Sequence, residues 1–178
     1  MMLSHLLDFV DMSNIWEQQF IVNNTTFIGK VTEKLSSLYI AYWKNQIGDS
    51  ERNPILRTYK LFKTQFCLES YLLNIQNHGI RKTLAKFRLS SHILQIEVGR
   101  HSKPKTPVAE RTCKCNESAI EDEMHLLLFC SFYSDLRCNF FQNISMTGII
   151  NRSDMSDLDF FVAIMSCKDK TIANMLGE

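Results

Sequence analysis

The chain contains 178 residues, of which 45% are hydrophobic and 22% are charged, and its formal net charge at pH 7 is +1. This composition is typical of a globular protein and excludes a long disordered or collagen-like chain. The length suits one domain, or one domain with a small metal-binding module. No apolar run is long enough to cross a bilayer, so we expect no membrane partner.

The charge is unevenly distributed along the chain. Residues 1–80 hold seven basic and seven acidic residues, residues 81–114 hold nine basic and two acidic residues, and residues 115–178 hold four basic and ten acidic residues. Such an asymmetry indicates a local basic surface that binds phosphate groups. The alternative is that the basic and acidic parts pair with each other.

The first residues argue against secretion. The apolar stretch from Leu3 to Val10 is interrupted by Asp8 and followed by Asp11, and no basic residue precedes it. It therefore does not match a secretory signal, and we expect an intracellular protein, cytoplasmic or nuclear. In a reducing compartment the six cysteines suit metal binding better than disulfide bonds.

Apolar residues predict several helices in the N-terminal half. Residues 1–30 show little periodicity, but from Val31 onward apolar residues recur at helical spacing up to a stop at Gly48. Pro54, preceded by an asparagine cap, predicts the start of a second helix, and a short third helix is expected to stop at Gly79. The apolar and aromatic residues on these helices are expected to form the core. They are Leu35, Leu38, Tyr39, Tyr42, Trp43, Ile55, Tyr59, Phe62, Phe66, Tyr71, Leu72 and Ile75.

The basic segment begins with a helix. Residues 80–90 predict an amphipathic helix whose apolar face turns inward. Alternation of apolar and polar residues over 94–98 favours a short strand, and Gly99 permits a turn after it. Residues 100–107 then form a basic loop with two prolines, which leads to the first cysteine of the next segment.

Residues 111–130 contain three cysteines and one histidine: Cys113, Cys115, His125 and Cys130. A structural zinc ion takes four ligands of this kind in a tetrahedron. In an extended segment residues i and i+2 point to the same side, so Cys113 and Cys115 can face one ion together. The sequence therefore predicts a CCHC zinc site at this position.

A helix over residues 119–129 is expected to carry His125. Ser118, with Glu121 three residues later, forms the capping-box pattern that starts a helix. Five residues turn an α-helix about 140° away from one face. Cys130 is therefore expected at the end of the helix or just beyond it.

Two alternatives to this site remain. Buried cysteines often act as small hydrophobic residues, and His125 would then be an ordinary core histidine. If one of the cysteines is not a ligand, Cys138 or His101 is the natural replacement.

Helices are also expected after Cys130. Apolar residues continue at helical spacing to about residue 141, and a polar connection follows over residues 143–154. Ser156 and Asp159 form a second capping-box pattern, which predicts a helix over the following apolar residues. A short last helix is expected over residues 172–176.

Taken together, these elements predict a mostly α protein, an irregular helical domain with a small CCHC zinc-binding module. We divide it into an N-terminal helical segment (residues 1–80), a basic helix and loop with the zinc module (residues 81–145) and a C-terminal helical tail (residues 146–178).

A further pattern runs through the basic segment and the cysteine cluster. It consists of residues 84–89, Ser91, His92, Leu94, residues 96–101, Glu110, Arg111, Cys113, Cys115, residues 121–123, residues 125–127, Cys130, Tyr133 and Arg137. In this order, residues 81–137 resemble the region downstream of the reverse transcriptase core in non-LTR retrotransposon polyproteins. The resemblance implies a zinc-binding module that follows the polymerase and assists nucleic-acid handling during target-primed reverse transcription.

The chain departs from that family in two respects. The family usually has two residues between its first two cysteines, whereas here Lys114 stands alone between them. The Tyr-x-Asp-Asp motif of the polymerase and the endonuclease pattern of some relatives are both absent from the sequence. We therefore expect a protein that is not an enzyme.

Three functions compete. The first is a zinc module that binds RNA or DNA through basic residues. The second is a structural or protein-interaction remnant that docks on a reverse transcriptase core. The third, a zinc hydrolase, is disfavoured because four protein ligands leave no position for water. The candidates for phosphate contact are Arg81, Lys82, Lys86, Arg88, Arg100, Lys103, Lys105, Arg111 and Lys114.

Overall fold

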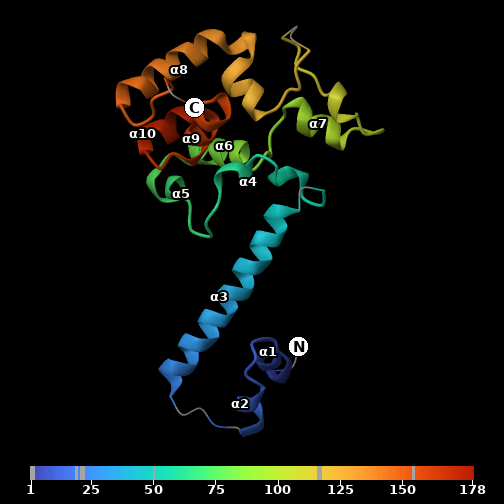
Figure 1. Cartoon of the computed structure of the whole chain (residues 1–178), viewed down its shortest axis with the longest axis vertical. Helices are drawn as coiled ribbons and strands as arrows, with labels where there is room; N and C mark the ends of the chain where they lie inside the picture. Colours follow the sequence, from blue (N-terminus) through green and yellow to red (C-terminus); the bar gives the residue numbers. More distant parts are fainter. Residues whose placement is uncertain (1–2, 19, 21–22, 50, 116–117, 154) are drawn as a thin grey trace. The chain divides into compact units, whose positions relative to one another are not determined.

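In the computed structural model the chain forms two compact units, residues 1–48 and residues 49–178 (Figure 1). The structure describes all residues except 1–2, 19, 21–22, 50, 116–117 and 154. The basic segment and the predicted zinc ligands all belong to the second unit. Across the part of the chain that the structure describes, no helix is both long and apolar enough to span a bilayer.

Among its described residues, the first unit contains three helices: α1 (Leu3–Phe9), α2 (Ser13–Gln18) and α3 (Asn24–Gly48). α1 and α2 pack against each other, and an ion pair between Asp11 and Lys34 joins the turn after α1 to α3. Helices as short as α1 and α2 show no clear period in a sequence.

The helix predicted from residue 31 is confirmed as part of α3, which begins earlier, at Asn24. The expectation that its apolar stripe forms core is wrong. No described residue of α3 is buried, and the side chains of Leu35, Tyr39 and Tyr42 are 45%, 57% and 59% exposed. α3 does carry an apolar stripe along one side, but the two short helices of this unit are too small to cover it.

The second unit is also helical, which confirms the mostly α fold. Its helical elements are η1 (Pro54–Leu56), α4 (Tyr59–Phe62), α5 (Ser70–Asn74), α6 (His78–Arg88), α7 (Gln95–His101), η2 (Val108–Glu110), η3 (His125–Phe129), η4 (Ser131–Tyr133), α8 (Ser134–Thr147), α9 (Asp157–Ser166) and α10 (Lys170–Gly177). Within the described ranges, β-structure is limited to one isolated antiparallel bridge between Thr112 and Ile120.

Three local predictions are wrong. Residues 94–98 do not form a strand, because the segment lies largely within α7. Gly79 does not end a helix; it lies in the first turn of α6, whose N-terminus is capped by the Asn77 side chain through the Gly79 and Ile80 amides. The polar connection expected from residue 143 begins later, because α8 continues to Thr147.

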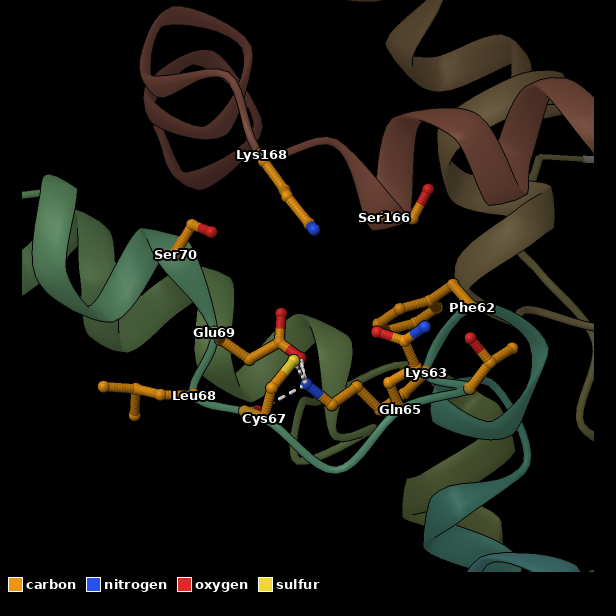
Figure 2. Close-up of a pocket in the computed structure, with 10 residues that line it drawn as sticks. Phe62, Lys63, Gln65, Cys67, Leu68, Glu69, Ser70, Ser166 and Lys168 are labelled. Carbon is orange, nitrogen blue, oxygen red and sulfur yellow. Dashed lines mark hydrogen bonds and ion pairs between the residues drawn. The ribbon is translucent and has the colours of Figure 1, made fainter.

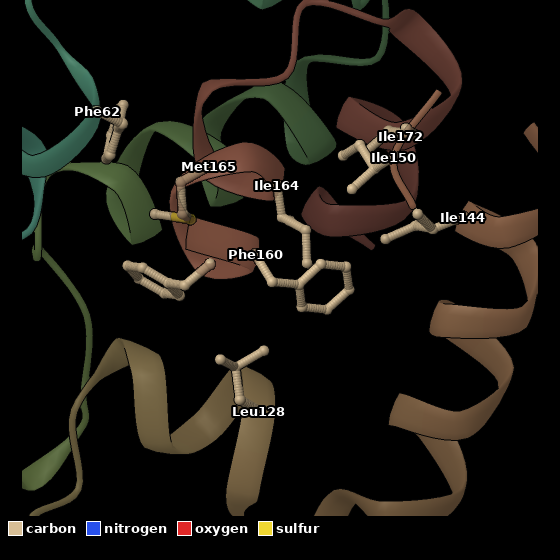
Figure 3. Close-up of a cluster of buried hydrophobic side chains, with 9 residues drawn as sticks. Phe62, Leu128, Ile144, Ile150, Phe160, Ile164, Met165 and Ile172 are labelled. Carbon is tan, nitrogen blue, oxygen red and sulfur yellow. The ribbon is translucent and has the colours of Figure 1, made fainter. Parts of the chain in front are cut away.

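α9 is the centre of the main core (Figure 3). The Ser156 hydroxyl caps this helix by accepting a hydrogen bond from the Asp159 amide at 3.1 Å, and it donates to Asp159 Oδ2 at 2.6 Å, so the predicted helix start at Ser156 is confirmed. Phe160 packs edge-on against Phe141, with ring centroids 5.1 Å apart. Around α9 lie buried side chains from four other elements and the loop after α8. They are Phe62 from α4, Leu128 from η3, Ile144 from α8, Ile150 from the loop and Ile172 from α10.

α6 and α10 form a second contact that closes the unit. Leu84 of α6 and Ala173 of α10 are buried in one cluster with residues of α5. The two helices approach so closely at Gly177 that a Cβ atom there would lie 2.7 Å from Ile80 Cγ2 and 2.8 Å from the Ile80 carbonyl oxygen. The amphipathic helix predicted over residues 80–90 is therefore confirmed, with its apolar face against α10.

A buried group of charges lies between α4, α5 and α6, beside a small pocket (Figure 2). Lys63 forms an ion pair with Glu69 and donates a hydrogen bond to the Cys67 carbonyl oxygen at 2.7 Å. Glu69 also accepts a hydrogen bond from Arg88 at 3.1 Å. The Arg88 guanidinium stacks over the Tyr71 ring, 4.7 Å from its centroid. These contacts fix the segment between α4 and α5, which has little regular structure of its own.

Candidate metal centre

A short antiparallel pairing positions the first two cysteines. The Cys113 amide donates to the Ala119 carbonyl at 2.8 Å, and the Glu121 amide donates to the Arg111 carbonyl at 2.9 Å. Cys113 and Cys115 lie on one arm of this pair, two residues apart, and both are buried. This is the arrangement expected when alternate residues of an extended segment face the same side.

A turn of π-helix positions the other two candidate ligands. Asp122 starts it by accepting a hydrogen bond from the His125 amide at 2.8 Å. At its end the Cys130 amide donates to the His125 carbonyl at 2.8 Å. An α-helix would turn residues five apart about 140° away from each other, whereas this i→i+5 bond brings them together. Such turns are frequent at functional sites.

The predicted start of this helix is wrong in detail. Ser118 does not cap it. Its φ is positive, 51°, and it precedes Ile120, the residue that pairs with Thr112 in the antiparallel bridge. The predicted partner in the capping box, Glu121, is used elsewhere. One of its carboxylate oxygens accepts a hydrogen bond from the Gln95 amide at 2.8 Å. The prediction that Cys130 lies just beyond the helix is confirmed.

The four side chains meet in one buried cluster. The Cys113 and Cys130 sulfurs are 3.7 Å apart, and the Cys115 sulfur is 3.3 Å from His125 Nε2. All four donor atoms lie within 4.8 Å of one another. In a tetrahedral zinc site the corresponding edges are about 3.8 Å between two sulfurs and about 3.5 Å between sulfur and nitrogen, given the usual bond lengths. The cluster therefore has the donor set and nearly the spacing of a metal site.

The three cysteines of the cluster are free thiols. A sulfur–sulfur distance of 3.7 Å is far longer than the roughly 2.05 Å of a disulfide bond. Burial, together with the neighbouring Cys115 and Cys130 groups, raises the pKa of the Cys113 thiol to about 12. A metal ion that binds here must therefore displace a proton from Cys113.

The alternative ligands considered from the sequence lie outside the cluster. Cys138, on α8, and His101, at the end of α7, are both exposed, and neither belongs to the group of four. The four residues originally predicted are the ones that the fold brings together.

Behind the cluster lies a network of buried charges centred on Glu123. Its carboxylate accepts hydrogen bonds from Arg57 at 2.8 and 3.0 Å and from the Thr58 hydroxyl at 3.0 Å, and it lies 2.7 Å from His92 Nε2. Burial alone would raise the pKa of Glu123, but the hydrogen bond with His92 and the charge of Arg57 outweigh it and lower the pKa to about 2. Glu123 is therefore ionised.

A second buried carboxylate extends this network. Glu97 of α7 pairs with Arg57 and accepts hydrogen bonds from Arg100 at 2.6 and 2.9 Å. The ion pairs of this network cannot be predicted from the sequence, because their members are far apart along the chain; Arg57 and Glu123 are separated by 66 positions. Glu97 and Glu123 lie within residues 81–137, for which a resemblance to retrotransposon tails is predicted from the sequence.

α7 is attached to the cysteine-bearing segment along its length. The Gln95 amide in its first turn donates a hydrogen bond to the Glu121 carboxylate, and the Ile96 amide donates to the Glu121 carbonyl oxygen at 3.1 Å. The Arg111 guanidinium donates to the Ile96 carbonyl at 2.9 Å and crosses the helix at Gly99. A Cβ atom on Gly99 would lie 2.7 Å from Arg111 Cγ. Gly99 therefore provides space for Arg111 and does not form the predicted turn.

The nine candidate phosphate-binding residues fall into two classes. The four arginines bond within the protein: Arg81 to the Ile75 carbonyl, Arg88 to Glu69, Arg100 to Glu97 and Arg111 to two carbonyls. Arg88 is buried, so the expectation that it contacts phosphate does not fit its position. The five lysines are exposed. They are Lys82, Lys86, Lys103, Lys105 and Lys114.

Comparisons of this chain with models of known protein families, with curated proteins and with solved structures found no match. The candidate site is therefore defined by its own geometry: three buried cysteines and one buried histidine, from an antiparallel pair and a π turn, form one cluster that could hold a metal ion.

Proposed function

We propose that the chain is a non-catalytic zinc-binding module that assists the binding of RNA or DNA. In this role it resembles the tail that follows the reverse transcriptase core in non-LTR retrotransposon polyproteins. The observation that carries the proposal is the buried cluster of Cys113, Cys115, His125 and Cys130, whose donor atoms are spaced for one tetrahedral ion. Three thiolates and one imidazole are a donor set that suits zinc.

The chemistry of the cluster supports a structural role for the ion. Four protein donors would complete the coordination of zinc and leave no position for a water molecule or substrate. The ion would instead hold the antiparallel pair against the π turn, two segments joined by little other regular structure. Structural zinc contributes on the order of 10–16 kcal/mol in small modules of this kind.

The exposed lysines support nucleic-acid binding. Two of them, Lys103 and Lys105, precede the cysteine-bearing segment, and Lys114 lies between its first two cysteines. The other two, Lys82 and Lys86, lie one turn apart on α6. Lysines at the surface contact phosphates without reading sequence, so affinity is expected to fall steeply with salt.

Metal analysis of the purified full chain tests the proposal. We expect about one zinc ion per chain, lost in the Cys130→Ala variant because three donors hold the ion far less tightly. Cys138→Ala is the matched control, since Cys138 is exposed and lies outside the cluster. Equal zinc content in the two variants would contradict the assignment of the ligands.

A second candidate is a structural or protein-interaction role, for example docking on a reverse transcriptase core. The observation that favours it is the exposed apolar stripe of α3, with Leu35, Tyr39 and Tyr42. It predicts that replacing Leu35 and Tyr42 by serine changes the association state of the protein in sedimentation experiments. The same replacement should leave zinc content unchanged.

A further inference from the structure

A groove of 790 Å³ lies between α6 and α7, on the side of the second unit that carries the buried charge network. Its volume falls within the range of ligand-binding pockets. The residues that line it come from three stretches of chain. They are Ile55, the second half of α6 with the loop after it, and the segment from Glu97 to Ser102.

One part of the groove is apolar. Phe87 and His92 contribute rings whose centroids are 6.1 Å apart, and Val98 faces the groove from α7. Ile93, in the loop between the two helices, is 88% exposed. An isoleucine held so far out of the core has no packing role in this unit. Exposed apolar and aromatic side chains accept the faces of nucleic-acid bases.

The other part of the groove is positively charged. Lys86 of α6 and Arg100 of α7 lie on opposite sides, and the exposed His101 follows Arg100. Among the described residues that line the groove, Glu97 alone is acidic, and its carboxylate is shared by Arg57 and Arg100. Arg100 is thus paired with Glu97, and the exposed Lys86 supplies the positive charge that complements an anionic ligand.

We infer that this groove binds a single-stranded segment of RNA or DNA, with bases against Phe87, Ile93 and Val98 and phosphates near Lys86. The inference rests on the proposed function and names the surface that performs it. A single strand fits because its bases are free to contact an apolar wall, whereas the bases of a duplex are stacked on one another and only their edges are accessible.

The groove is connected to the metal centre. His92, on its wall, contacts Glu123, which lies two residues before the candidate ligand His125. α7, the opposite wall, is held by Glu121 and Arg111 of the cysteine-bearing segment. Loss of the metal is therefore expected to disturb the wall formed by α7 and the position of His92, while α6 stays packed on α10. The role of the ion would be to hold the groove in its binding shape.

Fluorescence anisotropy with the zinc-loaded full chain and a labelled oligouridine tests the inference. We expect Lys86→Glu to weaken binding about tenfold at low salt, since a phosphate contact becomes a repulsion. Ile93→Ser should weaken it about fivefold with little change in salt dependence, since it removes apolar contact and no charge. The charge control is Lys170→Glu at the start of α10, an exposed lysine outside the groove, which should leave affinity within about twofold.

The experiment distinguishes a wrong assignment of the groove from a failure of the proposed nucleic-acid binding. If the wild type binds oligouridine but Lys86→Glu and Ile93→Ser bind as tightly as Lys170→Glu, the groove is not the binding surface, and nucleic-acid binding stands. If a duplex of the same length binds as tightly as the single strand, the single-strand assignment is wrong. If the zinc-loaded wild type binds neither at low salt, the proposed function fails together with the groove. Zinc content and circular dichroism of each variant check that the fold is intact.

Discussion

Glu123 connects the metal-bearing segment to the rest of its unit. Its side chain is almost fully buried and ionised, and its partners come from the turn before α4 and from the loop before α7. Removing one partner of a buried ion pair leaves the other charge buried without compensation. The Glu123 carboxylate therefore contributes to the stability of the module. The sequence does not indicate this, because Glu123 simply follows two other acidic residues, Glu121 and Asp122.

Replacing Glu123 by glutamine should therefore destabilise the protein. We expect a loss of roughly 3 kcal/mol in the free energy of unfolding, because Arg57 and His92 lose their negative partner. Urea unfolding of the zinc-loaded protein measures the change. The exposed Glu51→Gln variant is the control and should change stability by less than about 0.5 kcal/mol. Equal stabilities of the two variants would show that the network contributes little.

The Cys113 thiol provides a prediction about pH. Burial raises its pKa to about 12, so without metal it is protonated at neutral pH. Zinc binds thiolates, so binding must release protons, and the apparent affinity for zinc should fall as the pH is lowered. Calorimetric titration in two buffers with different ionisation enthalpies measures the number of protons released. An affinity that does not change with pH would argue against thiolate ligation.

At the scale of elements, α7 illustrates how the module is assembled. The helix has seven residues and cannot be stable by itself. Glu121 accepts hydrogen bonds from its first turn, and Arg111 crosses its surface where Gly99 has no side chain. The position of α7 therefore depends on contacts with the cysteine-bearing segment.

Gly99→Ala tests this dependence. A methyl group would meet Arg111 at Cγ and Cδ, atoms that cannot move freely because the guanidinium is bonded to two carbonyls. We expect a loss of about 1–3 kcal/mol of stability, as in other overpacked sites. Gly29→Ala in α3 is the matched control, since nothing lies within 4 Å of a Cβ there and alanine favours a helix. Thermal unfolding that ranks the two variants the other way would contradict the packing described.

Local signals in the sequence predicted part of this arrangement. Ser156 and Asp159 marked the start of α9 correctly, because their capping bonds involve only neighbouring residues. The same pattern at Ser118 and Glu121 failed, because Asp122 accepts from the His125 amide in place of Ser118, and the Glu121 carboxylate accepts from the Gln95 amide, 26 residues away. The strand predicted from the alternation over residues 94–98 also failed, because the segment lies largely in α7. Tertiary contacts decided its conformation, and a single sequence does not contain them.

The metal ligands were predictable for a different reason. Four ligand types within twenty residues restrict the chemistry whatever the local conformation. That Cys113 and Cys115 face the same side followed from their spacing in an extended segment, whereas the antiparallel pairing with residues 119–121 was not predicted. The π turn that brings His125 and Cys130 together was not predicted either, because no residue type in the segment specifies an i→i+5 bond.

Across the second unit as a whole, the metal-bearing segment meets the main core through η3 and the residues beside it, with Met124 and Leu127 packed against the core next to Leu128. Leu128 of η3 packs into the core around α9, whereas the cluster itself is held by the segments around α7. Removal of the metal should therefore loosen residues 95–130 first and leave the contact between α6 and α10 largely intact.

Hydrogen exchange with and without a zinc chelator tests this partition. We expect faster exchange of amides in residues 95–130 and little change in α9 and α10. Their hydrogen bonds lie in helices packed around buried Phe160 and Ile172. Uniform loss of protection across residues 49–178 would show that the ion supports the whole unit.

The central claim is that Cys113, Cys115, His125 and Cys130 hold one zinc ion. X-ray absorption at the zinc edge of the purified full chain tests it most directly, because it counts the ligands and measures their distances. The predicted result is three sulfur ligands at about 2.3 Å and one nitrogen ligand at about 2.0 Å. A shell of oxygen or nitrogen ligands with fewer than three sulfurs, or a protein that takes up no zinc, would contradict the account.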